Sequence, residues 1–246
     1  MAITNKESGT TVHEIADAIF RISTPVRHVP GGFSFNQYLV VDDAPLLFHT
    51  GPRRLFPLVL EAVRAVIAPG SLQYVAFSHV EADECGALNE WLAAAPHAAP
   101  VCGTIAAMVS VADLADRAPA PLADGERLSL GAKTMRWIDA PHLPHGWDCG
   151  FLFEEKTQTL FCGDLFTQGG AESPPLTEAD ILGPSEAFRK PLDYFAHAPD
   201  SRSQLERMAA LSPRTLACMH GSAWSGDGAT LLRALASALG QPAGGA

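Results

Sequence analysis

Hydrophobic residues in the first third of the chain occur in short β-branched and aromatic runs, which are typical of strands. Two such runs, 16–23 and 33–41, are separated by the turn sequence Pro30-Gly31-Gly32. A third strand is predicted over 46–50, where Gly51-Pro52 ends it. These runs predict adjacent hairpins, which a purely parallel βαβ repeat would lack.

Short apolar strands alternate with helical segments through the rest of the chain. Apolar residues at helical spacing predict helices over 55–67, about 85–95, 105–114, 205–211 and 230–239. Compact apolar runs predict strands over 72–78, near 100–102, about 127–130, and over 134–139, 150–154, 159–162 and 215–219. A loop is expected at 118–125, an irregular insertion rich in Gly, Pro and Ser at 167–200, and a loose tail at 241–246.

Strand-rich stretches interrupted by helices occur twice in this order. This pattern predicts an α+β fold in which two mixed sheets are flanked by helices, a four-layer αββα sandwich. A chain of 246 residues can form one large domain or two small ones. We expect a single domain over 1–246, with its core over about 15–240.

The composition excludes several classes of protein. Hydrophobic residues make up 47% and charged residues 18%, which is incompatible with disorder as the main state. Seventeen basic against 27 acidic residues give a net charge of −10, which disfavours binding to nucleic acid. No window reaches the roughly 18 apolar residues of a membrane span, and residues 1–12 lack a hydrophobic signal core. We therefore expect a cytoplasmic protein that binds neither nucleic acid nor membranes.

The segment 78–86, Ser-His-Val-Glu-Ala-Asp-Glu-Cys-Gly, concentrates metal-ligating side chains just after a predicted buried strand. His79, Glu81, Asp83 and Glu84 lie within six residues. In an extended loop, the side chains of residues 79, 81 and 83 would project in the same direction. Three neighbouring acids repel one another, and a dinuclear cation site would neutralise them.

Further candidate ligands follow other predicted apolar strands. His142 and His145 follow the strand at 134–139, Asp164 follows the run ending in Phe-Cys-Gly, and His220 follows the strand at 215–219. Lone polar groups at strand ends are where sheets of the α/β type place their binding sites.

The candidate ligands occur in a fixed order: an HxExD motif, a distant histidine, an aspartate after Phe-Cys-Gly and a late Met-His-Gly. This order resembles that of the metallo-β-lactamase fold. Within that fold it is similar to the oxygen-binding di-iron domains, including those of flavodiiron proteins. The resemblance covers about residues 15–240. The family's histidine lies 19 positions before its bridging aspartate, and His145 has this spacing to Asp164, so we prefer His145 to His142.

The resemblance implies which side chains hold each metal ion. The first iron would be bound by His79, Glu81 and His145. The second would be bound by Asp83 and His220, with Asp164 as the bridge. A homodimer is the usual assembly that the resemblance implies.

Two positions of the motif bear on the identity of the metal. The family's motif continues as HxExDH, and the sixth position here is Glu84, which either binds the second metal or leaves that position to water. Zinc hydrolases of this fold have histidine where this chain has Glu81. Three histidines with three or four carboxylates suit two iron ions, or manganese, better than zinc, which remains an alternative.

The resemblance implies binding or reduction of O2 or NO by a ferrous pair. Flavodiiron proteins also carry a flavodoxin domain of roughly 150 residues, which we do not expect here. A stand-alone reductase would therefore take electrons from a separate donor protein. One alternative is a dinuclear zinc hydrolase, in which a bridging hydroxide attacks an ester or thioester. Another is a non-catalytic oxygen or redox sensor that acts on a protein partner.

Three further residues are candidates for supporting the ligands. His49, in Phe-His-Thr-Gly, matches a place where the superfamily often has aspartate. His142 and Asp148 lie beside His145 in the sequence. We expect each to hold a ligand by hydrogen bonding or to serve the structure alone, rather than to bind metal.

Overall fold

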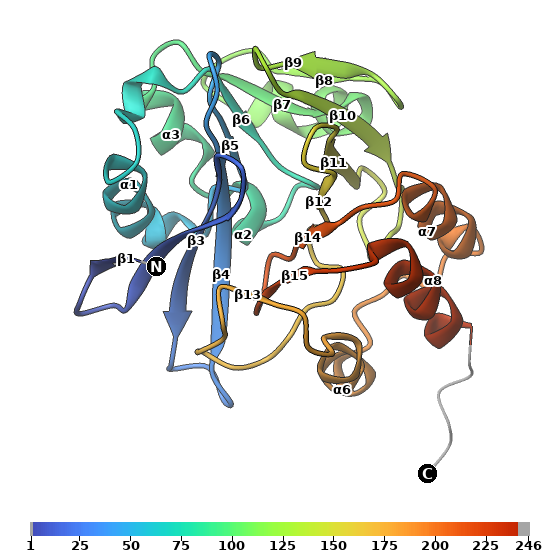
Figure 1. Cartoon of the computed structure of the whole chain (residues 1–246). Coiled ribbons are helices and arrows are strands. Elements are labelled where there is room, and N and C mark those ends of the chain that lie inside the picture. Colours follow the sequence, from blue (N-terminus) through green and yellow to red (C-terminus); the bar gives the residue numbers. More distant parts are fainter. Residues whose placement is uncertain (1, 241–246) are drawn as a thin grey trace.

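Two β-sheets lie between outer layers of helices in the computed structural model, which describes residues 2–240 (Figure 1). The predicted loose tail, 241–246, lies outside the described residues. The first sheet has eight strands in sequential order: β1 (Ala2–Asn5), β2 (Thr10–Ala16), β3 (Ile19–Val26), β4 (Phe33–Val40), β5 (Leu46–Phe48), β6 (Tyr74–Ala76), β7 (Ala99–Gly103) and β8 (Ala120–Leu122). Its strands pair antiparallel from β1 to β5 and parallel from β5 to β8.

The second sheet has seven strands and is also mixed. Its order is β13 (Leu176–Thr177), β15 (Ala223–Ser225), β14 (Thr215–Ala217), β12 (Thr159–Phe161), β11 (Gly150–Glu154), β10 (Thr134–Asp139) and β9 (Arg127–Ser129). The central pair β12 and β14 is parallel, and β10, β11 and β12 form antiparallel pairs. As a result, β6 of the first sheet and β10, β12 and β14 of the second can all contribute loops to one site.

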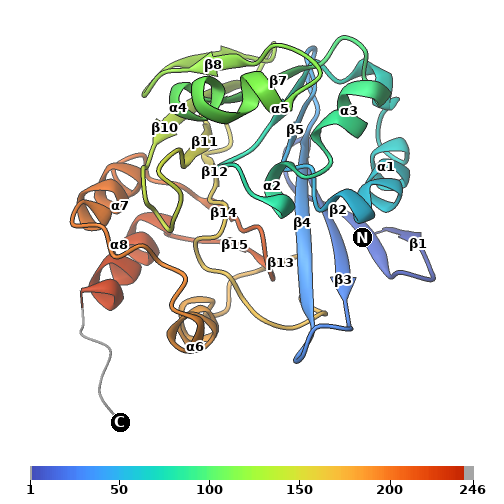
Figure 2. The same ribbon diagram turned by 180° about the vertical axis from the view of Figure 1, so that it is seen from behind.

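The helices cover the outer face of each sheet (Figures 1 and 2). The first sheet packs against α1 (Phe56–Arg64), α3 (Leu88–Ala94) and a helical segment made of α4 (Thr104–Ala106), a π-helical turn (Ala107–Val111) and α5 (Ala112–Leu114). The second packs against α6 (Leu182–Leu192), α7 (Ser201–Ala209) and α8 (Gly228–Leu239). A third apolar cluster, which includes Tyr38, Phe48, Trp137 and Phe161, fills the space between the sheets. This arrangement confirms the predicted αββα sandwich.

Local sequence explains where two of these helices begin. Pro57 lies in the first turn of α1, where its missing N–H costs nothing, and the helix buries Val59, Ala62 and Val63 on one face. The Asp227 side chain accepts a hydrogen bond from the backbone N–H of Thr230 and caps α8.

The structure corrects the prediction at the N-terminus. The expected strand at 16–23 spans a turn at Ala18, which has a φ of 54°, and the strand itself is β3 (Ile19–Val26). Strands β1 and β2 were not predicted. The sequence of β2, Thr-Thr-Val-His-Glu-Ile-Ala, has few large apolar side chains, and an irregularity between Glu14 and Ala16 interrupts the alternation of its buried residues.

Two segments expected to be irregular contain regular structure. The loop at 118–125 contains β8, and the insertion at 167–200 contains β13 and α6. Pro184 lies in the first turn of α6 and Pro191 next to its last residue, so neither proline interrupts the middle of the helix. Strand β15 was also not predicted, and the expected helix at 205–211 is α7, which begins at Ser201.

The helix expected at about 85–95 is α3, and a separate short helix, α2 (Ala82–Cys85), precedes it. Asp83 and Glu84 therefore lie on a helical turn, and the prediction that residues 79, 81 and 83 share an extended loop is wrong for Asp83. The turn changes the direction of the chain, so the motif presents His79 and Glu81 to one place and Asp83 and Glu84 to another.

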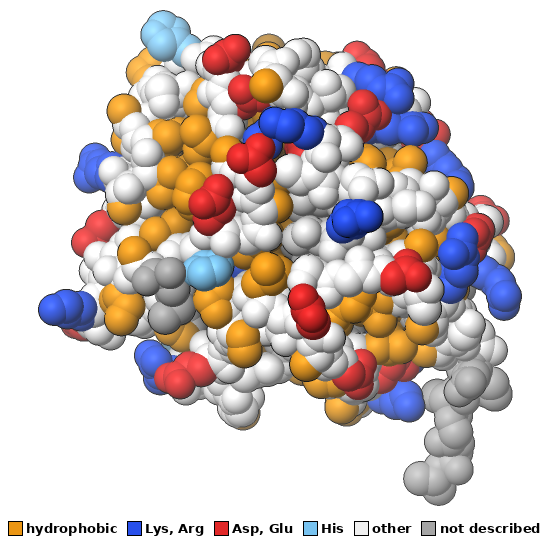
Figure 3. Space-filling view, in the orientation of Figure 1, with side chains coloured by type: hydrophobic (Ala, Val, Ile, Leu, Met, Phe, Trp, Pro, Cys, Tyr) orange, Lys and Arg blue, Asp and Glu red, His pale blue; other side chains and the backbone are white. Residues whose placement is uncertain are grey.

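Among residues 2–240, no helix combines the length and the apolar character that crossing a bilayer requires. On the face drawn in Figure 3, Lys and Arg side chains are interspersed with Asp and Glu.

Candidate metal centre

The seven predicted ligands come from the ends of strands in both sheets. His79 and Glu81 follow β6, and α2 carries Asp83 and Glu84. His145, Asp164 and His220 lie in the segments that follow β10, β12 and β14. Two groups of ligand atoms form, and within each group all atoms lie within 4.8 Å of one another.

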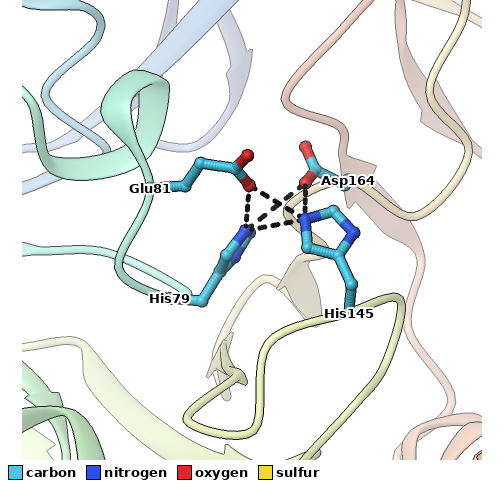
Figure 4. A group of neighbouring side chains, drawn as sticks. All are labelled: His79, Glu81, His145 and Asp164. Atoms are coloured by element: carbon cyan, nitrogen blue, oxygen red, sulfur yellow. Dashed lines mark hydrogen bonds and ion pairs between the residues drawn. The ribbon is translucent and has the colours of Figure 1, made fainter. Parts of the chain in front are cut away.

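The first group, His79, Glu81, His145 and Asp164, converges on one point (Figure 4). His79 Nε2 lies 3.0 Å from Glu81 Oε2 and 3.1 Å from His145 Nε2. His145 Nε2 lies 2.9 Å from the same oxygen of Glu81. Asp164 Oδ2 is 3.7 Å from His79 Nε2 and 3.5 Å from His145 Nε2. Such close approach of two imidazole nitrogens and two carboxylates is typical of a metal cage.

The second group consists of Asp83, Glu84 and His220. His220 Nε2 lies 3.4 Å from Asp83 Oδ2 and 3.2 Å from Asp164 Oδ1. The geometry of the latter pair is that of a charge contact without a hydrogen bond. Asp164 therefore turns one carboxylate oxygen towards each group, as a bridging ligand must.

The backbone fixes the proton positions of two histidines. His145 Nδ1 lies 3.1 Å from the carbonyl oxygen of Tyr194, and His220 Nδ1 lies 2.8 Å from that of Ser34. A carbonyl oxygen only accepts, so each Nδ1 carries the proton and donates it. In the neutral rings, Nε2 is left with its lone pair directed into the cluster, which is the arrangement of a metal ligand.

Burial and neighbouring charges shift the pKa values of the candidate ligands. Burial, followed by the charges of Asp164 and Asp83, raises the pKa of Glu84 well above its usual range. Burial also acts to raise the pKa of Asp164, but His220 and the other histidines lower it to about 2. For His220, burial acts to lower the pKa, and Asp164 and Asp83 raise it to about 9. Hydrogen bonding with His145 and His79 lowers the pKa of Glu81.

The polar atoms of this cluster fit a pair of cations. Both carboxylate oxygens of Glu84 and Oδ1 of Asp164 are buried without a hydrogen-bond partner among the described residues. Such groups are costly unless something satisfies them, because burial removes their hydration. The donor set consists of three imidazoles and four carboxylates, and a pair of divalent ions would neutralise all four carboxylates.

A family model provides the decisive comparison. The sequence model of the family described as "ODP family beta lactamase" matches residues 33–221, which is well over half of the chain. This range contains all seven candidate ligands. The chain belongs to this family.

Relatives of this ODP-family chain are longer than the chain itself. A diflavin flavoprotein from Thermosynechococcus vestitus is 28% identical over 198 residues, which cover 77% of this chain and 34% of that protein. The rubredoxin-oxygen oxidoreductase of Megalodesulfovibrio gigas is 26% identical over 206 residues, which cover 80% and 50%. The chain thus spans between a third and a half of the length of these relatives.

A solved structure confirms the metallo-β-lactamase fold. A variant flavo di-iron protein from Thermotoga maritima superposes with a TM-score of 0.82 at 18% identity, covering 94% of this chain and 61% of that one. At this level of identity the likeness shows the fold alone. The ligand assignments for the ODP-family chain therefore depend on its own geometry.

The three residues that were expected to support the ligands lie in three different environments. Asp148 Oδ2 accepts a hydrogen bond from the backbone N–H of Val80 at 3.0 Å and so holds the segment between His79 and Glu81. His49 is buried and contacts Ser78. His142 is exposed, and among the described residues it is not part of either ligand group.

Several residues that shape the site were not predicted from the sequence. A cavity of about 180 Å³ over the ligands is walled by Phe33, Phe188, Leu192 and Tyr194. The last three come from α6 and the segment just after it, in the supposedly irregular insertion. Tyr194 also donates its hydroxyl to the backbone carbonyl of Asp164 at 3.2 Å. The aromatic residues within 188–195 were the sequence feature that could have indicated a wall of the site.

Proposed function

We propose that this chain holds two iron ions and uses them to reduce O2 or NO. His79, Glu81 and His145 would bind the first ion, and Asp83, Glu84 and His220 the second. Asp164 would bind both. Bound ferrous iron supplies the electrons for such chemistry, and the protein supplies the position and the surroundings.

The observation that carries the proposal is the excess of carboxylates over histidines. Four carboxylates and three histidines converge in one site, and four of these side chains are buried. Zinc sites in proteins favour His and Cys, whereas oxygen-rich sets suit iron or manganese. The names of two relatives, the rubredoxin-oxygen oxidoreductase of Megalodesulfovibrio gigas and a nitric oxide reductase of Moorella thermoacetica, agree with this choice of substrate.

The cavity over the ligands supports a small substrate. Its volume, about 180 Å³, is below the several hundred Å³ that are usual for pockets holding larger organic ligands. Phe33, Phe188 and Tyr194 contribute apolar walls, which suit an uncharged diatomic molecule.

Complete reduction of O2 to water takes four electrons and four protons, whereas two ferrous ions hold two electrons between their ferrous and ferric states. A reductant must therefore supply the remainder, and we propose a separate electron-donor protein. A homodimer and a cytoplasmic location remain predictions from the sequence.

Iron-loaded protein purified without oxygen tests the proposal. Metal content, the absorption spectrum before and after air, and consumption of O2 or NO with a chemical reductant would be measured. We expect two iron ions per chain and reductant-dependent consumption that Asp164→Ala abolishes and Asp113→Ala, an exposed control on α5, retains. Two zinc ions with ester or thioester turnover would overturn the proposal in favour of a hydrolase. Iron binding with an oxygen-dependent spectrum but no consumption would overturn it in favour of a sensor.

A further inference from the structure

His79 differs from the other two candidate histidine ligands in what its Nδ1 faces. Where His145 and His220 each face a carbonyl, Nδ1 of His79 lies 2.9 Å from the hydroxyl oxygen of Ser78. A hydroxyl can donate or accept, so Ser78 alone leaves the tautomer of His79 open. The other neighbour of that hydroxyl, Nε2 of His49 at 3.0 Å, must decide it.

Two independent contacts assign the tautomer of His49. The backbone N–H of Ser78 is directed at His49 Nε2, with a nitrogen–nitrogen distance of 3.4 Å, and an N–H can only donate. Nε2 therefore carries the lone pair. Nδ1 faces the thioether sulfur of Met219 at 2.8 Å, and a thioether has no proton to donate. Both contacts place the ring proton of His49 on Nδ1.

The direction of the whole chain of hydrogen bonds follows from that assignment. Because His49 Nε2 accepts, the Ser78 hydroxyl donates to it, and the Ser78 oxygen is then free to accept from Nδ1–H of His79. This leaves the lone pair on Nε2 of His79 facing Glu81 and His145. We propose that His49 and Ser78 are positioning residues that fix the tautomer and ring orientation of His79 for the first metal ion. This inference rests on the proposed metal centre.

The far end of this series of hydrogen bonds is Met219, which backbone groups from both sheets hold in place. Met219 donates its backbone N–H to the carbonyl of Gly163 and accepts from the N–H of Asn36, both at 2.9 Å. Gly163 immediately precedes Asp164, and Met219 immediately precedes His220. His49 therefore connects the orientation of His79, a ligand after β6, to the segments that present the bridging aspartate and a ligand of the second ion.

The backbone of His49 supports a specific role for this side chain. His49 has a φ of 65°, a left-handed conformation that is uncommon outside glycine but is enriched in Asn, Asp and His. Such conformations concentrate at functional sites. Of those three residue types, only neutral histidine both accepts at the distance of Ser78 and donates to Met219. Burial lowers the pKa of His49 to about 3, which keeps the ring neutral.

The tautomer of His49 can be measured in zinc-loaded protein, which is diamagnetic, by long-range proton–nitrogen correlation spectra. We expect a protonated Nδ1 and a bare Nε2 on His49, with His79 also protonated at Nδ1. An Nε2-protonated His49 would overturn the proposal. If the wild-type chain binds no zinc and no iron, the proposed function fails, and the spectrum of His49 in the metal-free protein still decides the direction of the hydrogen bonds.

Cobalt titration separates positioning from a purely structural role. Ser78→Ala removes the hydroxyl, and His49→Asn tolerates the left-handed backbone but is too short to reach Ser78. We expect each variant to lower the affinity for Co²⁺ about 10–100-fold at the first site, which contains His79. The affinity at the second site should change less than about threefold. Ser237→Ala and His97→Asn, both exposed, are the matched controls.

Unchanged affinity in both Ser78→Ala and His49→Asn, or equal loss at both metal sites, would overturn the proposal. Should His49→Asn fail to fold, Ser78→Ala and the wild-type spectra still decide it.

Discussion

Asp164 directs Oδ1 at Nε2 of His220 across 3.2 Å while its Oδ2 faces the first ligand group. A carboxylate with this orientation belongs to both groups, whereas His220 belongs to one. We expect Asp164→Ala to weaken binding of both metal ions and His220→Ala to weaken only the second. Stepwise titration with Co²⁺, followed by absorption, measures the two affinities separately. Retention of two tightly bound ions in Asp164→Ala would refute the bridging role.

Glu84 offers a second test of the ligand set, because both of its oxygens are buried without a partner among the described residues. Glu84→Gln keeps the size of the side chain but removes its charge. We expect affinity for the second ion to fall at least about tenfold, with the first ion much less affected. Glu90→Gln on α3 is the matched control, since Glu90 lies outside both ligand groups. Equal affinities in Glu84→Gln and wild-type protein would mean that water takes this position.

The cluster also predicts how the stability of the metal-free protein depends on pH. Despite the opposing effect of burial, neighbouring carboxylates raise the pKa of His220 from 6.5 to about 9. A raised folded-state pKa adds stability that is fully present below pH 6.5 and is lost as the pH rises through 9. The raised pKa of Glu84 acts in the same direction. We expect the free energy of unfolding to fall by up to about 3 kcal/mol over this window.

Urea unfolding of chelator-treated protein at a series of pH values measures this dependence. His220→Asn should remove much of the slope, and His97→Asn should retain it. A wild-type stability that stays flat from pH 6.5 to 9 would contradict the prediction.

Gly150, on β11, connects the core to the ligand segment. Its N–H donates to the carbonyl of Ser78 at 2.9 Å, and a Cβ at this position would lie 2.6 Å from Cε2 of Trp137. We expect Gly150→Ala to destabilise the fold by about 1–3 kcal/mol, because the buried indole must move. Gly70→Ala, whose Cβ would approach nothing closer than 3.9 Å, should cost much less. Thermal or urea unfolding compares the two, and similar losses would exclude the steric explanation.

The candidate ligands could be predicted from sequence because they are side chains of distinctive chemistry at the ends of apolar strands. The HxExD spacing and the positions of Asp164 and His220 are properties of residue type and order. His49 and Asp148 could be named as supporting side chains, but the backbone groups that orient His145 and His220 could not be predicted in this way. The carbonyls of Tyr194 and Ser34 hold His145 and His220, and every residue has a carbonyl, so only the tertiary structure selects these two.

The same distinction explains the errors in the fold. Strong apolar runs such as those of β11 and β14 are recognisable because both faces of the strand are buried. Strand β2 has one half-exposed face and a polar sequence, and its pairing with β3 depends on a partner across a tight turn. Helix α6 has glycine and proline near its ends, so its composition resembles that of a loop although its interior is helical.

The origin of the ligands in two different sheets has a thermodynamic consequence. His79 and Glu81 extend from the first sheet, whereas His145, Asp164 and His220 extend from the second. Ions held between them would link the two sheets, and their binding free energy would add to the stability of the folded protein. Loss of the ions would then first loosen the strand ends that carry the ligands, so metal supply would govern how long the protein survives as well as whether it works.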